Sequence, residues 1–148
     1  MKKIIAMVCS LFLSFQLIYA QHDVVTRDVN KLPAAAREFV KTQFPNSQIS
    51  YLKVDKSLFS STSYDVKLST GVDLEFDNNG EWIEIDCENL RSIPMSVLPD
   101  SIRNYMKKEY PKHRVVKVER KHKGYELTLE NDLEVDFDKY GNFLKLSD

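Results

Sequence analysis

The chain has 148 residues, of which 43% are hydrophobic and 29% charged, and its formal net charge at pH 7 is −1. This balance argues against a nucleic-acid-binding protein, because such proteins carry a basic surface. Two cysteines are present, and one of them lies in an N-terminal leader, so we expect a fold held by its hydrophobic core rather than by an internal disulfide.

Residues 1–20 have the pattern of a secretory signal peptide. Lys2 and Lys3 precede an apolar run, and Ala20 offers a cleavage point before Gln21. Cleavage would leave 19 basic and 22 acidic residues and a single cysteine, Cys87. No second apolar stretch has the length of a membrane span. We therefore expect a periplasmic or secreted protein without an integral membrane segment after signal cleavage.

Two helices are predicted, at about Pro33–Gln43 and Pro99–Glu109. Apolar side chains recur at helical spacing within each range. Proline suits the first turn of a helix, where its missing N–H is not needed. Pro45 and Pro111 follow the two ranges, and the residue before a proline disfavours helical geometry, so we expect both helices to end there.

Segments of strand periodicity follow each helix. In these segments apolar and polar side chains alternate, which is typical of an antiparallel sheet that is covered on one face. Gly80 and Gly141 are expected in four-residue turns that need a positive φ. The first helix is followed by segments near Ile49–Val54, Tyr64–Ser69, Val72–Asp77 and Glu81–Asp86, and the second by segments near Val115–Lys121, Tyr125–Glu130, Leu133–Asp138 and Asn142–Leu146.

The order of these segments is repeated along the chain. Leu32-Pro33 recurs as Leu98-Pro99, 66 positions later, and Tyr64 to Leu68 recurs as Tyr125 to Leu129, 61 positions later. Such self-similarity indicates a duplicated structural unit. We therefore predict an α+β fold, a tandem duplication of a helix packed on a four-stranded antiparallel sheet (α-β4-α-β4). The predicted boundaries are 21–88 for the first unit, 89–95 for a linker and 96–148 for the second unit; the sequence leaves open whether the two sheets join.

Two acidic patterns raise the question of a cation site. Asp132, Glu134, Asp136 and Asp138 alternate along one segment, which the solvated face of a strand explains. The stretch from Glu75 to Asp86 has a loose similarity to a calcium loop, but it lacks the final glutamate and the flanking helices, and a hairpin turn explains it equally well. We therefore expect no metal site and no cofactor.

The sequence contains no arrangement typical of a catalytic site. Cys87 lies between Asp86 and Glu88, whose charges should raise the pKa of its thiol. No glycine loop for phosphate, serine-nucleophile motif or zinc-protease motif occurs. We therefore predict that the protein is not an enzyme.

Three aromatic residues are expected on the uncovered face of the sheet. If Ile83 and Ile85 face the helix, then Trp82 points outward, and the same register places Tyr51 and Phe143 outward. Aromatic rings bordered by charges are typical of a protein-binding patch, although such rings also shield a sheet locally. The predicted binding face comprises Tyr51, Trp82, Phe143, Lys53, Lys67, Glu84 and Asp136.

These motifs resemble those of the PepSY-like family of exported bacterial proteins, which is related to the beta-lactamase inhibitory protein. The resemblance rests on Leu32-Pro33, Phe44-Pro45 and Asp77 to Trp82, and again on Leu98-Pro99, Tyr110-Pro111 and Asp138 to Phe143. It implies a beta-lactamase-inhibitor-like tandem fold in which an aromatic sheet surface grips a partner protein. No residue that contacts a target can be matched, so the resemblance does not carry over the target.

The sequence therefore predicts a non-catalytic exported module that binds or inhibits a protein of unknown identity, such as an exported enzyme, through the exposed sheet face. The alternative is a periplasmic protein that binds a small ligand or a cation.

Overall fold

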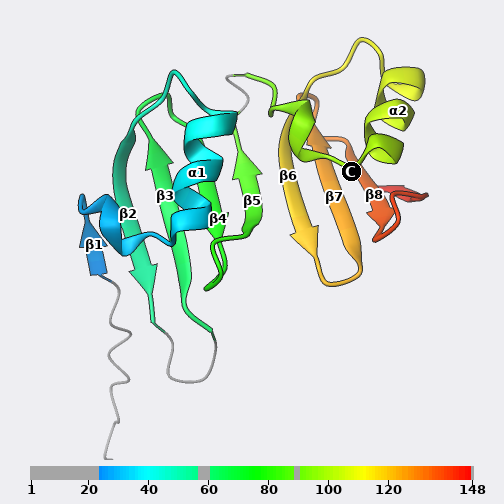
Figure 1. Ribbon diagram of the computed structural model, residues 1–148. Helices are drawn as coiled ribbons and strands as arrows, with labels where there is room; N and C mark the ends of the chain where they lie inside the picture. The colour runs from blue at the N-terminus through cyan, green and yellow to red at the C-terminus, as the bar shows by residue number, and fades with distance from the viewer. Residues whose placement is uncertain (1–23, 57–60, 89–90, 148) are drawn as a thin grey trace, which may run out of the picture.

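The computed structural model describes residues 24–56, 61–88 and 91–147 (Figure 1). The predicted signal peptide, residues 1–20, and residues 57–60 lie outside these ranges. The elements follow in the order β1 (Val24–Thr26), the 3₁₀ turn η1 (Val29–Lys31), α1 (Ala34–Gln43), β2 (Ile49–Asp55), β3 (Ser63–Leu68), β4 (Asp73–Phe76), β5 (Trp82–Asp86), the 3₁₀ turn η2 (Met95–Val97), α2 (Asp100–Glu109), β6 (Val115–Lys121), β7 (Gly124–Leu129), β8 (Glu134–Asp138) and β9 (Phe143–Ser147).

All the strands belong to a single open sheet, and the predicted α+β fold of two tandem units is wrong. The described residues form one nine-stranded antiparallel sheet in the order β1 to β9, so the protein is mostly β. Strand β5 pairs with β6 through Ile85 opposite Val118, with one further residue pair on each side. Both of these side chains are fully buried. The two halves therefore share a core, because separating β5 from β6 would expose these apolar side chains to water.

The two helices lie on the same face of this sheet (Figure 1). Their limits agree with the predicted ranges to within one residue, and each ends just before an aromatic-proline pair. Phe39 of α1 meets Phe76 edge-on at a ring distance of 5.7 Å. Tyr105 of α2 meets Phe137 in the same way at 5.3 Å. The aromatic residue in the middle of each helix thus fixes the helix to the strand beneath it.

The sheet therefore has a helix-bearing face, which forms the core, and a helix-free face. Alternate apolar residues along the strands point to the helix-bearing face, and Leu52, Ile85, Leu127 and Val135 have no exposed surface there. The intervening polar residues point to the helix-free face, as the period-two pattern predicts. Among the described residues, no helix has the length and apolar character that crossing a membrane requires.

The predicted glycine turns hold the hairpins against the helix ends. Gly80 has a φ of +82°, and a Cβ placed on it would lie 2.8 Å from Cβ of Pro33 and 2.9 Å from the backbone nitrogen of Ala36. Glycine is needed here both for its backbone conformation and for the close approach of α1. Oδ1 of Asp77 accepts hydrogen bonds from two backbone N–H groups of the same turn. The stretch with a loose similarity to a calcium loop is therefore a hairpin turn.

Candidate functional site

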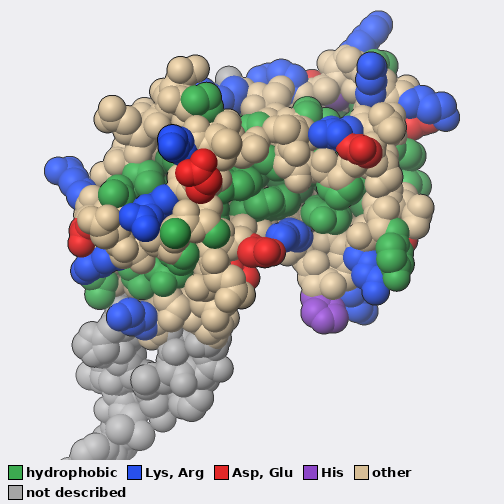
Figure 2. All heavy atoms as spheres, in the orientation of Figure 1, with side chains coloured by type: hydrophobic (Ala, Val, Ile, Leu, Met, Phe, Trp, Pro, Cys, Tyr) green, Lys and Arg blue, Asp and Glu red, His purple; other side chains and the backbone are tan. Residues whose placement is uncertain are grey.

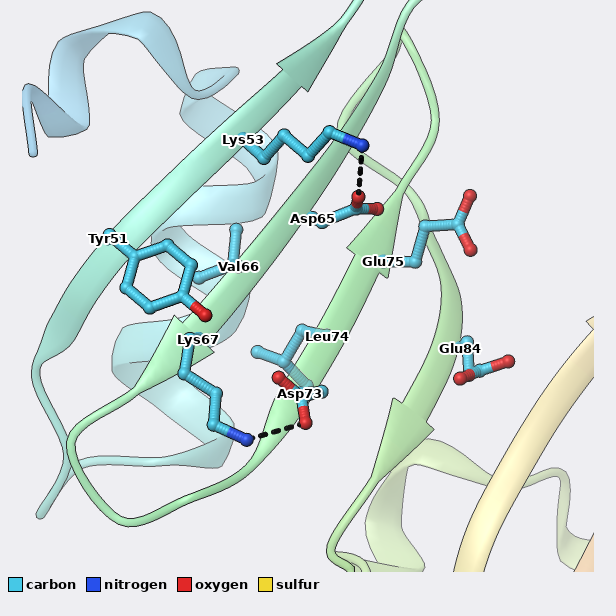
Figure 3. A pocket seen from close by; sticks show the side chains of 9 residues that line it. All are labelled: Tyr51, Lys53, Asp65, Val66, Lys67, Asp73, Leu74, Glu75 and Glu84. Carbon is cyan, nitrogen blue, oxygen red and sulfur yellow. Dashed lines mark hydrogen bonds and ion pairs between the residues drawn. The ribbon is translucent and has the colours of Figure 1, made fainter. Parts of the chain in front are cut away.

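The helix-free face carries a pocket of about 310 Å³ over strands β2 to β5 (Figure 3). Alternation places the polar side chains of these strands on one surface, so residues from four strands meet there. Four of the predicted binding residues line this pocket. The lining consists of Tyr51, Lys53, Asp65, Val66, Lys67, Asp73, Leu74, Glu75 and Glu84.

Tyr51 supplies an aromatic side chain at this pocket. It lies opposite Lys67 in the pairing of β2 with β3. Its side chain is 45% exposed, which is high for a ring of this size. An exposed aromatic ring beside charged groups is typical of surfaces that bind other proteins.

Lys67 links two acidic residues at one end of the pocket. Its Nζ lies 2.7 Å from Oδ2 of Asp73 and 2.7 Å from Oε1 of Glu88. The hydrogen bonds to Asp73 and Glu88 raise the pKa of Lys67. Burial raises the pKa of Asp73 although it accepts a hydrogen bond from Lys67, whereas the same lysine lowers the pKa of the exposed Glu88. The lysine therefore stays charged throughout the physiological pH range.

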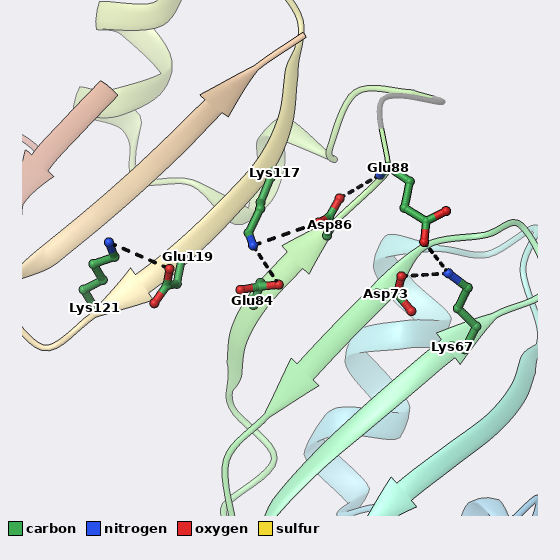
Figure 4. A network of polar contacts seen from close by, with 8 residues as sticks. All are labelled: Lys67, Asp73, Glu84, Asp86, Glu88, Lys117, Glu119 and Lys121. Atoms are coloured by element: carbon green, nitrogen blue, oxygen red, sulfur yellow. Dashed lines mark hydrogen bonds and ion pairs between the residues drawn. The ribbon is translucent and has the colours of Figure 1, made fainter. Parts of the chain in front are cut away.

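A further set of ion pairs crosses the junction between the two halves of the sheet (Figure 4). Nζ of Lys117 on β6 lies 3.1 Å from Oε1 of Glu84 on β5 and 4.0 Å from Oδ2 of Asp86. Burial opposes the charge of Lys117, but the hydrogen bond with Glu84 and the charges of Glu84 and Asp86 raise its pKa overall. Opposite charges on neighbouring strands stabilise the pairing, so this lysine supports the continuous sheet.

Glu75 is the acidic centre of the pocket. Burial raises the pKa of its carboxyl group, and the nearby carboxylates of Asp65, Glu84 and Glu119 raise it further. Among the described residues, no lysine or arginine lies within ion-pair distance of Glu75. Figure 3 shows the side chains of Glu75 and Glu84 on the side of the pocket away from Tyr51. The pocket thus has two lysine–aspartate pairs, Lys53 with Asp65 and Lys67 with Asp73, and the carboxylates of Glu75 and Glu84 on the side away from Tyr51.

Two of the predicted aromatic residues lie on the opposite face, so the prediction of three outward rings is wrong. The pairing register shifts between Glu75 and Phe76, which places Trp82 opposite the buried Phe76. A second shift, between Asp136 and Phe137, places Phe143 opposite the buried Phe137. An extra residue in one strand reverses the facing of every residue beyond it. Trp82 and Phe143 therefore point to the helix-bearing face.

Trp82 contacts both halves of the molecule on that face. Its ring centroid lies 6.5 Å from that of Phe39 and 6.4 Å from that of Tyr125, and the guanidinium of Arg120 lies 5.0 Å above it. Arg120 is held there by Glu81, at 2.9 Å. Figure 2 shows hydrophobic side chains gathered between the two helices on this face. Phe143 stacks on Tyr105 at 5.2 Å.

The remaining predicted residue, Asp136, lies on the helix-free face but outside the pocket. It pairs with Lys145 across β8 and β9, with Oδ2 at 3.3 Å from Nζ. The structure thus brings Tyr51, Lys53, Lys67 and Glu84 together and leaves Asp136 on the other half of the sheet. Asp65 and Asp73 are pocket residues that were not predicted, although the alternation of β3 and β4 places them on the same face.

The cysteine does not form part of a reactive site. Cys87 has no exposed surface. Burial is the main cause that raises the pKa of its thiol to about 11. The charge of Asp86, which the sequence predicted to act, raises it by less. Within residues 24–56, 61–88 and 91–147, no three His, Cys, Asp or Glu side chains are grouped so that they could hold a metal ion.

Comparisons with known proteins connect this architecture to a family and to solved structures. A family model described as "Putative beta-lactamase-inhibitor-like, PepSY-like" matches residues 62–145. A structure described as a putative periplasmic protein of unknown function from Bacteroides vulgatus is 60% identical, covers 85% of this chain and 99% of its own, and has a TM-score of 0.81. A second protein from that organism, described as a putative periplasmic protein from the DUF2874 family, is 36% identical, with coverages of 87% and 99% and a TM-score of 0.79.

A protein from Bacteroides thetaiotaomicron, described as a putative calcium-regulated periplasmic protein, is 32% identical. It covers 85% of this chain and 97% of its own, with a TM-score of 0.79. No curated protein matches the chain.

Proposed function

This chain belongs to the PepSY-like family, and from that premise we propose that it is a non-catalytic periplasmic module that binds another protein through the helix-free face of its sheet. The family's inhibitor-like description supports a protein as the partner and a role without catalysis. The periplasmic location is supported by the descriptions of three solved relatives.

The observation that carries this proposal is the pocket around Tyr51. Its ring offers an apolar contact, and the groups around it carry both signs of charge. Lys53 and Lys67 are paired with Asp65 and Asp73, while Glu75 and Glu84 lie on the side away from the ring. In protein interfaces a central aromatic residue provides much of the affinity, while surrounding charges set orientation and the rate of association. This combination favours a partner that inserts an apolar side chain flanked by charged groups.

Capture of partners from the exported fraction by immobilised residues 21–148 tests the proposal. Tyr51→Ala should weaken binding of the captured protein by about 2 kcal/mol or more, as expected for a central aromatic contact. Tyr140→Ala is the matched control, because Tyr140 is also exposed, at 71%, but lies in the turn between β8 and β9. If both variants lost affinity for the captured protein equally, or if neither lost affinity, the pocket would be excluded as the binding site.

A second candidate function is cation binding, which the description of the relative from Bacteroides thetaiotaomicron as calcium-regulated favours. Because no three carboxylates among the described residues are grouped as a metal site, the corresponding proposal for this chain is that Ca²⁺ is attracted by the summed negative charge around Glu75, Asp65 and Glu84 rather than held by a ligand set. Binding to the native state raises the unfolding temperature, and the stabilisation grows with the logarithm of the ligand concentration once this exceeds the dissociation constant. Calcium titrations of wild type and of Glu75→Gln, followed by thermal unfolding, test this candidate; an equal shift in both proteins would place the cation elsewhere.

A further inference from the structure

Two grooves of nearly equal size lie on the helix-bearing side of the molecule, away from the pocket of Tyr51. The first groove, of about 650 Å³, lies between η1, α1 and the start of β2, and the second, of about 640 Å³, lies between η2, α2 and the start of β6. Both are open surface grooves, so a bound molecule would lie along them rather than be enclosed. The linings include Val29, Arg37, Val40, Lys41, Phe44 and Ile49 in the first groove, and Met95, Arg103, Met106, Lys107, Tyr110 and Val115 in the second.

The two grooves present the same two cations at equivalent helix positions. Arg37 and Lys41 line the first groove, and Arg103 and Lys107, each 66 positions later, line the second. Neighbouring polar positions of the two helices differ, since Glu38 corresponds to Asn104 and Thr42 to Lys108. The negative end of the helix dipole favours a lysine in the last turn, but it does not explain the arginine in the middle of each helix. The arginine and the lysine are therefore the two cations that both grooves share, although Asn104, which also lines the second groove, stands where the first helix has Glu38.

The cations make only exposed contacts, which a ligand can displace. Nη1 of Arg37 donates to Oδ1 of Asn30 at 3.1 Å, a neutral group that leaves the charge uncompensated. Arg103 pairs with Asp100, and Nζ of Lys41 lies 4.0 Å from Oε2 of Glu38. Both pairs lie within one helix and are exposed, and such pairs contribute little to stability. Among the residues that the structure describes, no carboxylate pairs with Lys107. Arginine and lysine one turn apart lie on the same side of a helix, so each groove has two cations at one rim.

The floor of each groove is apolar. Val40 and Met106 are 5% and 3% exposed, and they occupy the same position in the two grooves. Phe44 and Tyr110 add an aromatic ring at the corresponding end. An apolar floor with two cations at the rim complements a ligand that has an anionic head and an aliphatic chain, since the chain is removed from water while the head keeps charged partners.

We propose that each groove binds one fatty-acid-like carboxylate, with its head between the arginine and the lysine and its chain along the apolar floor. The protein then has two equivalent small-ligand sites, which are separate from the protein-binding face. This inference does not depend on the proposed function of the helix-free face.

Titration calorimetry with decanoate tests the proposal. Wild type should bind two molecules per chain. The Arg37→Gln, Lys41→Gln variant and the Arg103→Gln, Lys107→Gln variant should each lose one site, with affinity at the altered groove reduced at least about tenfold by loss of the charged contacts. The variant that combines all four substitutions should not bind decanoate.

Controls of ligand charge and of position keep the test decisive even if a variant folds poorly. Decyltrimethylammonium, with the same chain and the opposite charge, should not bind wild type. Lys108→Gln removes a lysine from α2 that does not line the groove, and it should bind decanoate as wild type does. The proposal would be overturned if wild type did not bind decanoate, or if it bound both amphiphiles equally. It would also be overturned if the variant with all four substitutions still bound two molecules of decanoate.

Discussion

Replacing Trp82 with alanine should destabilise the protein without acting on the proposed binding face. The indole contacts Phe39 of α1, Tyr125 of β7 and Arg120 of β6, so its removal loosens both halves of the molecule. A partly buried tryptophan covers roughly 100 Å² of apolar surface, worth about 2.5 kcal/mol. Because substitution of a fully buried aromatic residue by alanine costs about 3–5 kcal/mol, we expect a loss of about 2–3 kcal/mol in the free energy of unfolding.

Urea denaturation followed by circular dichroism measures this loss, with Tyr51→Ala as the matched variant. Tyr51 is 45% exposed on the helix-free face, so its substitution should change the free energy of unfolding by less than about 0.5 kcal/mol. The effects on partner binding should be the opposite of the effects on stability. Tyr51→Ala should bind the partner more weakly, whereas Trp82→Ala should bind it nearly as wild type does under conditions where the variant is folded. An unfolding free energy of Trp82→Ala within 0.5 kcal/mol of wild type would refute the assignment of Trp82 to the helix-bearing face.

Three further predictions concern the turn, the acidic pocket and the cysteine. Gly80→Ala should cost about 1–3 kcal/mol, because φ is +82° and the new Cβ would meet Pro33 and Ala36; an unchanged denaturation midpoint would contradict this. The pKa of Glu75 is higher in the folded protein than its ordinary 4.5 in the unfolded chain. The unfolded chain therefore loses this proton more readily, and the free energy of unfolding falls as the pH rises above 4.5. Glu75→Gln should therefore unfold at a higher temperature than wild type at neutral pH, with the difference vanishing below pH 4.5, and a pH-independent difference would count against burial as the cause. Cys87, with a pKa of about 11 and no exposed surface, should react with a thiol reagent only on unfolding, and rapid labelling of the native protein would exclude this burial.

The local elements could be predicted from the sequence because their signals lie within a few residues of one another. Pro33 and Pro45 bracket α1, and the helix limits follow from the missing N–H of proline and from its effect on the preceding residue. Gly80 marks a turn because few other residues adopt a positive φ. The alternation in β3 and β4 places Lys67 and Glu75 on the helix-free face, and the structure has them there.

The arrangement of these elements could not be predicted in the same way. The two halves join because Ile85 and Val118 bury each other where β5 meets β6, a contact between residues far apart in the chain. Alternation predicts that each strand has an apolar face, but it does not say whether neighbouring strands belong to one sheet or to two.

By itself, the sequence determined the two helices, the strands β2 to β9 and the glycine turns, but not the short strand β1 (Val24–Thr26), whose three residues are too few to show a period. The tertiary structure alone decided that Trp82 and Phe143 lie on the helix-bearing face. A shift of one residue in the pairing of β4 with β5, and another in that of β8 with β9, turns these rings to the helix-bearing face. The physical reason is that the facing of a side chain depends on its register with the partner strand, and a bulge changes that register without changing the alternation in the sequence.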